Sequence, residues 1–222
     1  MKGLLIKDFK LVFQSSFRFL ILFVVAMLFL ATNKDTNWLV PYIVSYTTMI
    51  AFIFGLTSFS YDDFENGTQF LLTLPITRKT YVKEKYVFCM GLCLIGGLFS
   101  LLLLTCAFTI RGMELPAMGF LLQNTLGNFL GSMVLLSLAI PFQIKFGTTG
   151  KNIVYMVMCV IVIVLVTLAQ DLKSVFANAD ILLENISNMD ERLLWAILCL
   201  IAIMLLTISY GISVRILKKK EL

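Results

Sequence analysis

The sequence predicts an all-α polytopic membrane protein, and composition, charge and the spacing of the charges all favour this fold class. Apolar and aromatic residues make up 59% of the 222 residues, and the mean hydropathy is +0.94. Charged residues account for 14%, where about 25% is usual in soluble proteins. Because a soluble domain of this length needs more charge on its surface, we expect residues 1–222 to form a single transmembrane domain.

The first element expected is an amphipathic elbow helix over residues 1–16. Leu5, Phe9 and Val12 follow one helical stripe, while Lys7 and Lys10 follow another. A basic amphipathic helix that leads into a membrane span is expected to lie in the membrane interface. It either anchors the first span or takes part in the movement of a dimer.

Six membrane-spanning helices are expected, because charged residues divide the chain into six long uncharged windows. A helix needs about 20 residues to cross the hydrocarbon core, and a charge near its centre is costly. The first window is short, so Arg18 is expected to extend toward the lipid headgroups. The helices predicted from these windows span about 17–33, 38–60, 84–110, 116–141, 151–170 and 193–214.

The orientation of these helices follows from Lys and Arg. With six spans, both termini lie on one side of the membrane, together with 14 of the 18 basic residues. Basic residues gather on the cytoplasmic side of membrane proteins. Both termini are therefore expected in the cytoplasm, and the net charge of +5 is explained by topology, so no nucleic-acid partner is expected.

The cytoplasmic loop 61–83 is the most informative stretch. It opens with the acidic residues Asp62, Asp63 and Glu65, continues into an apolar cluster too short to cross a membrane, and stops at Pro75. Such a segment either lies against the membrane or docks into a groove on a partner protein. Physical argument from the residues alone leaves both readings open.

The same loop resembles the first cytoplasmic loop of ABC-2 type transporter permeases. The likeness rests on Asn66-Gly67-Thr68, on the run Phe70 to Lys79, and on Lys85-Tyr86. In hydropathy it extends over the whole chain, which resembles in particular the small permeases of bacterial peptide exporters, including exporters of phenol-soluble modulins and antimicrobial-peptide resistance systems. One departure is that the outer loop 171–192 lacks an apolar re-entrant segment, which leaves the outer gate unassigned.

What this resemblance implies is a half-transporter in the bacterial plasma membrane. Two such permease chains, as a homodimer, would form the pathway, and two separate ABC ATPase subunits would bind ATP and Mg²⁺ and hydrolyse the ATP. The chain itself would be no enzyme and would hold no cofactor or metal. The ATPase-coupling residues implied by the resemblance are Asp62, Asp63, Phe64, Glu65, Asn66, Gly67, Thr68, Phe70, Leu71, Leu72, Leu74, Pro75, Arg78 and Lys79.

Two absences in the sequence limit its own chemistry. No His is present, which excludes imidazole relays and Ser-His or Cys-His nucleophile pairs. The five Cys all fall in apolar windows and are interpreted as small core residues. The nearest approach to a P-loop, residues 146–152, has Lys145 in place of the first Gly and Asn152 in place of the hydroxyl, so it is interpreted as a helix-capping loop.

The fourth window carries the polar residues of greatest interest within the membrane. Gln123, Asn124 and Asn128 lie near its outer half, and Gly127 and Gly131 form a small-residue packing motif. Asn124, Asn128 and Gly131 share one helix face. These residues either form interhelical hydrogen bonds in a close helix contact or line a route for cargo.

The function expected is that of a permease subunit of an ABC exporter that moves amphipathic or antimicrobial-type peptides out of the cell. No charged residue lies in the middle of a predicted span, which disfavours ion-coupled transport. The alternatives are a regulatory or assembly membrane protein without cargo and a subunit of a lipid or drug exporter. A membrane enzyme acting on lipid is disfavoured, because its catalytic inventory would be thin.

Overall fold

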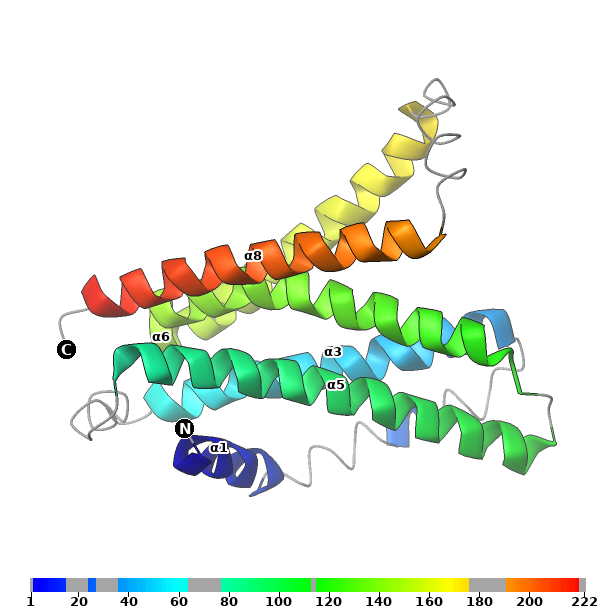
Figure 1. The fold of residues 1–222 in the computed structure, drawn as a ribbon, viewed down its shortest axis with the longest axis horizontal. Coiled ribbons are helices and arrows are strands. Elements are labelled where there is room, and N and C mark those ends of the chain that lie inside the picture. The colour runs from blue at the N-terminus through cyan, green and yellow to red at the C-terminus, as the bar shows by residue number, and fades with distance from the viewer. Residues whose placement is uncertain are drawn as a thin grey trace.

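The computed structural model describes residues 2–14, 24–26, 36–63, 77–112, 115–175 and 191–219, and within these ranges it contains helices and no strand. The main helices are α1 (Lys2–Gln14), α3 (Thr36–Asp63), α5 (Arg78–Arg111), α6 (Met118–Val175) and α8 (Glu191–Lys219). In Figure 1, α3, α5, α8 and the first half of α6 run alongside one another, with α1 next to one end of this bundle. The all-α fold class is confirmed.

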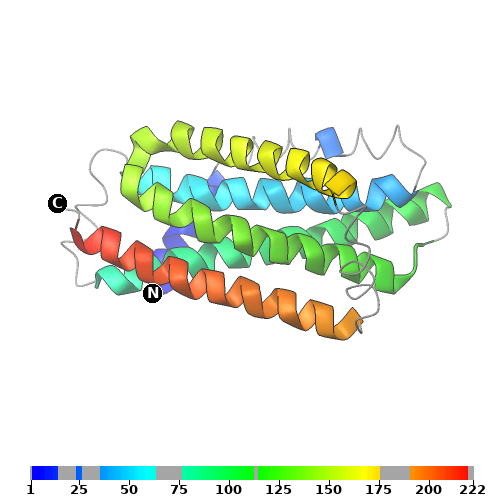
Figure 2. The ribbon, with the colours of Figure 1, turned by 90° about the horizontal axis from the view of Figure 1, so that it is seen from above.

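Four helices in the described ranges are long and apolar enough to cross a membrane: Leu39–Asp62, Arg78–Arg111, Met118–Gly147 and Leu193–Lys219. The first predicted span lies outside the described residues except at 24–26, and the fifth is helical as the second half of α6. The count of six spans therefore stays a prediction. Figure 2 shows the long helices lying roughly parallel, and the N-terminal helix and the C-terminal end of α8 lie toward the same end of the bundle.

Helix α5 begins at Arg78, whereas residue 84 is the start expected from the sequence. Thr77 explains the earlier start, because its extended backbone and its side chain, which accepts from the Thr80 N–H at 3.2 Å, cap the helix. The 34 residues of α5 extend about 51 Å at 1.5 Å per residue, well beyond a hydrocarbon core of about 30 Å. The basic first turn is thus helical without having to lie in lipid.

Helix α6 runs through Pro141, the region where the fourth helix was expected to end, and its break comes at Gly147. Gly147 has φ 60° and ψ −148°, a conformation that glycine tolerates because it has no Cβ. This glycine lies in the segment 146–152 that was interpreted as a capping loop. The break thus lies between the ranges 116–141 and 151–170 expected for the fourth and fifth helices, and α6 continues past residue 141.

Helices α3 and α5 pack closely enough to exclude a side chain at two glycines. A Cβ on Gly96 would lie 2.7 Å from the Cβ of Ala51 and 3.1 Å from the carbonyl oxygen of Thr47. A Cβ on Gly55 would lie 3.0 Å from the Sγ of Cys89. We call this contact the α3–α5 seam.

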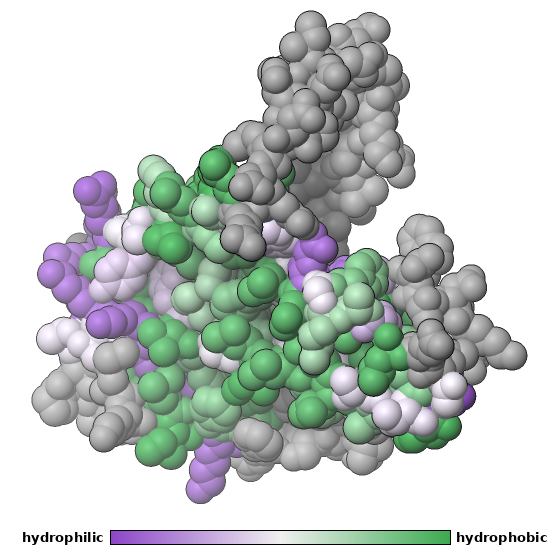
Figure 3. Space-filling model, turned by 45° about the vertical axis from the view of Figure 1, so that its right-hand side comes forward, coloured by the Kyte–Doolittle hydropathy of each residue, from purple (hydrophilic) through white to green (hydrophobic). Residues whose placement is uncertain are grey.

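The surface of the bundle is apolar over its middle, and Figure 3 shows hydrophilic side chains gathered near one edge of the face in view. Helix α8 is the most exposed of the long helices, with Leu200, Ile203 and Ile208 all more than half exposed. Large apolar side chains in such a continuous surface are typical of a face that contacts lipid or another membrane helix. The bundle thus has the surface that a membrane domain requires.

Candidate functional site

A cavity of about 1040 Å³ lies between α3 and α6 and opens to the surface. We call it the α3–α6 groove. Within the described ranges its wall holds aromatic, amide, hydroxyl and aliphatic side chains and no charged one. The lining residues are Tyr42, Ser45, Tyr46, Thr48, Met49, Phe52, Phe120, Gln123, Asn124, Gly127, Asn128, Gly131, Ser132, Val134 and Leu135.

The structure brings together all five residues singled out in the fourth window, since Gln123, Asn124, Gly127, Asn128 and Gly131 all line the groove. They occupy the α6 wall, because they recur at helical spacing on one face of that helix. They are therefore neighbours in space as the sequence suggested.

These residues differ in what surrounds them in the structure. Asn128 belongs to a helix contact, because its Oδ1 accepts a hydrogen bond of 2.9 Å from the Ser45 hydroxyl of α3. A Cβ on Gly127 would lie 3.5 Å from the Trp195 ring of α8. A Cβ on Gly131, in contrast, would meet no described atom within 4 Å. Gly127 thus lies in a helix contact, whereas Gly131 borders open space.

The α3 wall of the groove was missed by sequence reasoning. Tyr42, Ser45, Tyr46, Met49 and Phe52 lie on it, and the rings of Tyr42 and Tyr46 stack with centroids 6.0 Å apart and planes 9° apart. The spacing of these five residues by three or four is the signal that could have found them. Since the window around them is apolar throughout, that signal alone does not distinguish a groove wall from a packed face.

A second feature is a buried group of charges at the end of the bundle where α1 packs. We call Lys7, Asp8, Asp62, Glu84 and Lys85 the ionic cluster. The Lys85 ammonium lies 2.5 Å from Asp8 Oδ2 and 2.6 Å from Asp62 Oδ2, and Lys7 pairs with both aspartates as well. The cluster joins α1, α3 and α5, because its members come from all three helices.

Two neighbouring hydroxyls add hydrogen bonds to the ionic cluster. Ser58 accepts a hydrogen bond from the Lys85 ammonium and donates one of 2.8 Å to Asp8 Oδ2. The Tyr81 hydroxyl donates to Asp62 Oδ2 at 3.1 Å. Buried ion pairs are tolerated when hydrogen bonds satisfy their remaining atoms, and this arrangement meets that condition for Lys85.

The ionic cluster holds three carboxylates against two ammonium groups. Glu84 is fully buried, interacts electrostatically with the other four members, and neither of its oxygens has a hydrogen-bond partner in the described part of the chain. The two aspartates, by comparison, each contact both lysines. Glu84 is thus the member of the cluster whose charge is least stabilised by direct contacts with described residues.

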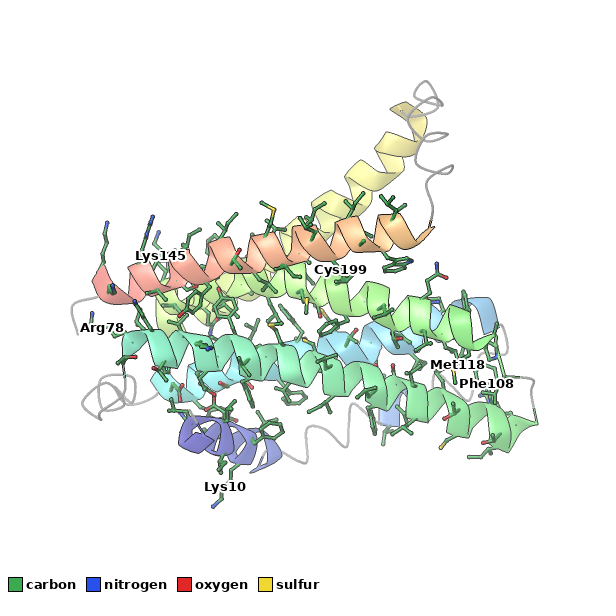
Figure 4. All side chains as sticks on the ribbon, in the orientation of Figure 1. Lys10, Arg78, Phe108, Met118, Lys145 and Cys199 are labelled. Carbon is green, nitrogen blue, oxygen red and sulfur yellow. The ribbon has the colours of Figure 1, made fainter. Side chains whose placement is uncertain are left out.

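The predicted coupling loop is described only at its ends. Asp62 is buried in the ionic cluster and Asp63 ends α3, while Arg78 donates to the carbonyl oxygens of Leu217 and Lys218 at the end of α8. Figure 4 shows Arg78 at that end of the bundle. The Lys79 carbonyl oxygen accepts from Tyr210 of α8 at 3.5 Å. The other predicted coupling residues lie outside the described ranges: Phe64, Glu65, Asn66, Gly67, Thr68, Phe70, Leu71, Leu72, Leu74 and Pro75.

The cysteines divide into two pairs among the residues whose side chains are described. Cys89 and Cys93 are buried and free, as expected of small core residues, whereas Cys106 and Cys199 are free and exposed on the bundle surface. The prediction of core positions was therefore wrong for the second pair, because an apolar window does not specify which of its faces is buried. No group of three or more Cys, Asp or Glu residues in the described part of the chain could hold a metal ion.

Comparison with known proteins identifies one family. A family model described as "ABC-2 family transporter protein" matches residues 3–218, which include the groove, the ionic cluster and all four candidate membrane helices. Neither a curated protein nor a solved structure matches the chain.

Proposed function

This chain belongs to the ABC-2 family of transporter proteins, and we propose that it is the permease subunit of an ATP-driven exporter with the α3–α6 groove on its transport path. The groove is the observation that carries the proposal, because it is a hollow of about 1040 Å³ in a bundle of membrane-type helices. The described residues of its wall include no charged one, so an apolar or amphipathic molecule can enter there without meeting an unpaired buried charge.

The cargo of this proposal is an amphipathic peptide of the antimicrobial type. An amphipathic peptide needs apolar surface for one face and hydrogen-bonding groups for the other. The groove offers both, since Met49, Phe52 and Leu135 lie in the same wall as Asn124 and Asn128. The resemblance of the loop 61–83 to that of bacterial peptide exporters supports the same cargo class.

Membership of the ABC-2 family implies partnership with ABC ATPase subunits. In our proposal two such subunits bind ATP and Mg²⁺, carry out the hydrolysis, and contact the segment between α3 and α5. The ionic cluster supports this coupling, because Lys85 pairs with Asp62 at the end of α3 and with Asp8 of α1. A displacement of the segment would then move α1, α3 and α5 together. Asp62 acts here through the interior of the chain, since its side chain is buried.

The assembly of this proposal is a homodimer of the permease in the bacterial plasma membrane. The concentration of basic residues on the predicted cytoplasmic side supports cytoplasmic termini. The N-terminal helix and the C-terminal end of α8 lie toward the same end of the bundle, as that topology requires (Figure 1).

Filling the groove tests the proposed function. In Gly131→Phe the new ring enters open space, since a Cβ there meets no described atom within 4 Å. We expect the chain to fold and to retain its ATPase partner, and the peptide concentration needed for half-maximal stimulation of ATP hydrolysis to rise about tenfold or more, which corresponds to about 1.4 kcal/mol of lost binding. The measurement uses the tagged chain, purified together with its ATPase and reconstituted in vesicles.

The matched control is Gly211→Phe on α8, where a Cβ also meets nothing within 4 Å but the residue lies outside the groove. This variant should hydrolyse ATP as the wild type does. Unchanged peptide stimulation in Gly131→Phe would remove the groove from the transport path. Purification of the chain without any P-loop protein, even after crosslinking, would contradict the permease assignment itself.

A further inference from the structure

Three hydroxyls that line the groove offer acceptors more readily than donors. The hydroxyls of Ser45, Thr48 and Ser132 each donate their hydrogen within the protein, to Asn128 Oδ1, to the Val44 carbonyl and to the Phe129 carbonyl. Since a hydroxyl has one hydrogen and two lone pairs, each of these groups keeps acceptor capacity and no donor. A ligand that brings N–H donors therefore fits them better than a ligand that brings acceptors.

The two asparagines of the groove follow the same pattern. Asn124 Nδ2 donates to the Phe120 carbonyl at 2.8 Å, and Asn128 Nδ2 donates to the Asn124 carbonyl at 3.0 Å. Each amide thus spends part of its donor capacity on the preceding turn of α6. Asn124 also lines the groove, and its Oδ1 is a hydrogen-bond acceptor.

Tyr42 and Tyr46 add aromatic faces at the same end of the groove. Their rings lie one turn apart on α3 and stack at 6.0 Å, and the described residues that line this wall include no Lys or Arg. The face of an aromatic ring carries partial negative charge and attracts cations within about 6 Å of its centroid. This end of the groove is therefore suited to a cationic group although it has no carboxylate.

The groove is graded along its length. The Ser45–Asn128 hydrogen bond aligns α3 with α6, so Tyr42 and Asn124 lie on one side of it, and Phe52 and Leu135 lie on the other. Ten residues separate Tyr42 from Phe52, which corresponds to about 15 Å of helix. One end of the groove is hence aromatic and rich in acceptors, while the other end is aliphatic and aromatic without amides.

We propose that the α3–α6 groove selects cationic over anionic amphipathic peptides, with a lysine ammonium bound over Tyr42 and Tyr46 beside Asn124 and apolar side chains bound toward Phe52 and Leu135. The inference rests on the proposed function and adds to it the charge of the cargo and the residues that read it. Tyr42 and Tyr46 act as specificity-determining residues. Charge complementarity is the reason, because the described residues of the wall supply ring faces and acceptors and include no cation.

Photo-crosslinking tests this selectivity without any need for ATP hydrolysis. The full chain is placed in vesicles of zwitterionic lipid with a short leucine–lysine amphipathic helix that carries one photoreactive leucine. The second probe is the same peptide with every lysine replaced by glutamate. We expect the lysine peptide to label residues of the groove, and the glutamate peptide to label them about tenfold less, as a desolvated cation–aromatic contact of 1–2 kcal/mol implies.

The variant that tests the tyrosines is Tyr42→Leu with Tyr46→Leu, which keeps the groove apolar and removes both rings of the stacked pair. Labelling by the lysine peptide should fall to the level of the glutamate peptide. The matched control is Tyr61→Leu, which removes an exposed tyrosine of the same helix outside the groove and should leave labelling unchanged.

The outcomes separate this inference from the proposed function. Equal labelling of the groove by both peptides would overturn charge selection and leave peptide transport through the groove in place. Labelling by neither peptide would overturn both. Crosslinks from the groove to a second copy of the chain, in place of peptide, would show that the groove is an interface and would overturn the inference as well.

Discussion

The two faces of α3 differ more than their sequences suggest. Toward α5 the helix forms the α3–α5 seam, where a Cβ on Gly96 would lie 2.7 Å from the nearest side-chain atom. Toward α6 it borders a hollow of about 1040 Å³, where a Cβ on Gly131 would meet no described atom. Both faces are built from apolar residues with scattered small polar ones. The difference lies in what stands opposite each face.

This difference indicates which helices of the bundle are expected to move together. The seam and the ionic cluster join α1, α3 and α5 by close packing and by buried ion pairs. The groove lies between α3 and α6, and the Ser45–Asn128 hydrogen bond joins the two helices within it. Because interdigitated cores deform less readily than open contacts, we expect opening of the bundle to occur along α3 and α6.

Lys85→Met is the change expected to have the largest effect, because it disrupts the ionic cluster that joins α1, α3 and α5. It leaves Asp8 and Asp62 without their fully buried cation, and removing one partner of a buried ion pair costs about 3–5 kcal/mol. The thermal midpoint of the purified chain in detergent should fall strongly. Reduced packing of α1 should also make the N-terminal segment more sensitive to proteolysis.

The control for this prediction is Glu84→Gln, one residue away in the same cluster. The substitution removes the carboxylate that has no hydrogen-bond partner in the described ranges, so the thermal midpoint should stay the same or rise. An equal fall in the thermal midpoint of both variants would contradict this prediction. It would mean that any change of charge destabilises the cluster, and that Lys85 is no more important than Glu84.

Gly96→Val is expected to have the second-largest effect, since it forces the seam apart. The added side chain would overlap Ala51 and the Thr47 carbonyl, and overpacking of a tight contact costs about 1–3 kcal/mol. The neighbouring Gly97→Ala is the matched control, because its nearest contact would be an ordinary 3.9 Å to Thr48. The thermal midpoints of the two variants measure the difference in stability. An unchanged midpoint for Gly96→Val would show that the α3–α5 seam can accommodate an added side chain.

Ser45→Ala is expected to have the smallest effect, and it tests the contact between α3 and α6 at the groove. It removes the hydrogen bond to Asn128, and a bond of this kind contributes about 0.5–1.5 kcal/mol. If the groove opens during transport, the loss should raise the basal ATPase activity of the reconstituted complex while the thermal midpoint changes little. A fall in the midpoint as large as that of Gly96→Val would remove the distinction between the two faces.

Part of the candidate site was predictable from the sequence. The polar residues of the fourth window stood out because amides are rare in apolar spans, and the structure places all five residues on the groove. The α3 wall did not stand out, since tyrosine, serine and methionine are common in membrane helices. The ionic cluster was missed because its charges stand at the edges of windows, where charged residues are ordinarily solvated.

Membrane character, helical class and the rough position of each described span follow from the sequence by itself. The physical reason is that transfer into lipid is a sum over neighbouring residues, so local composition is sufficient to determine it. Only the tertiary structure decided that Lys85 pairs with Asp8 and that α3 is sealed on one face and hollow on the other. Those features depend on which atoms stand opposite one another across helices far apart in the chain, and hydropathy contains no information about that pairing.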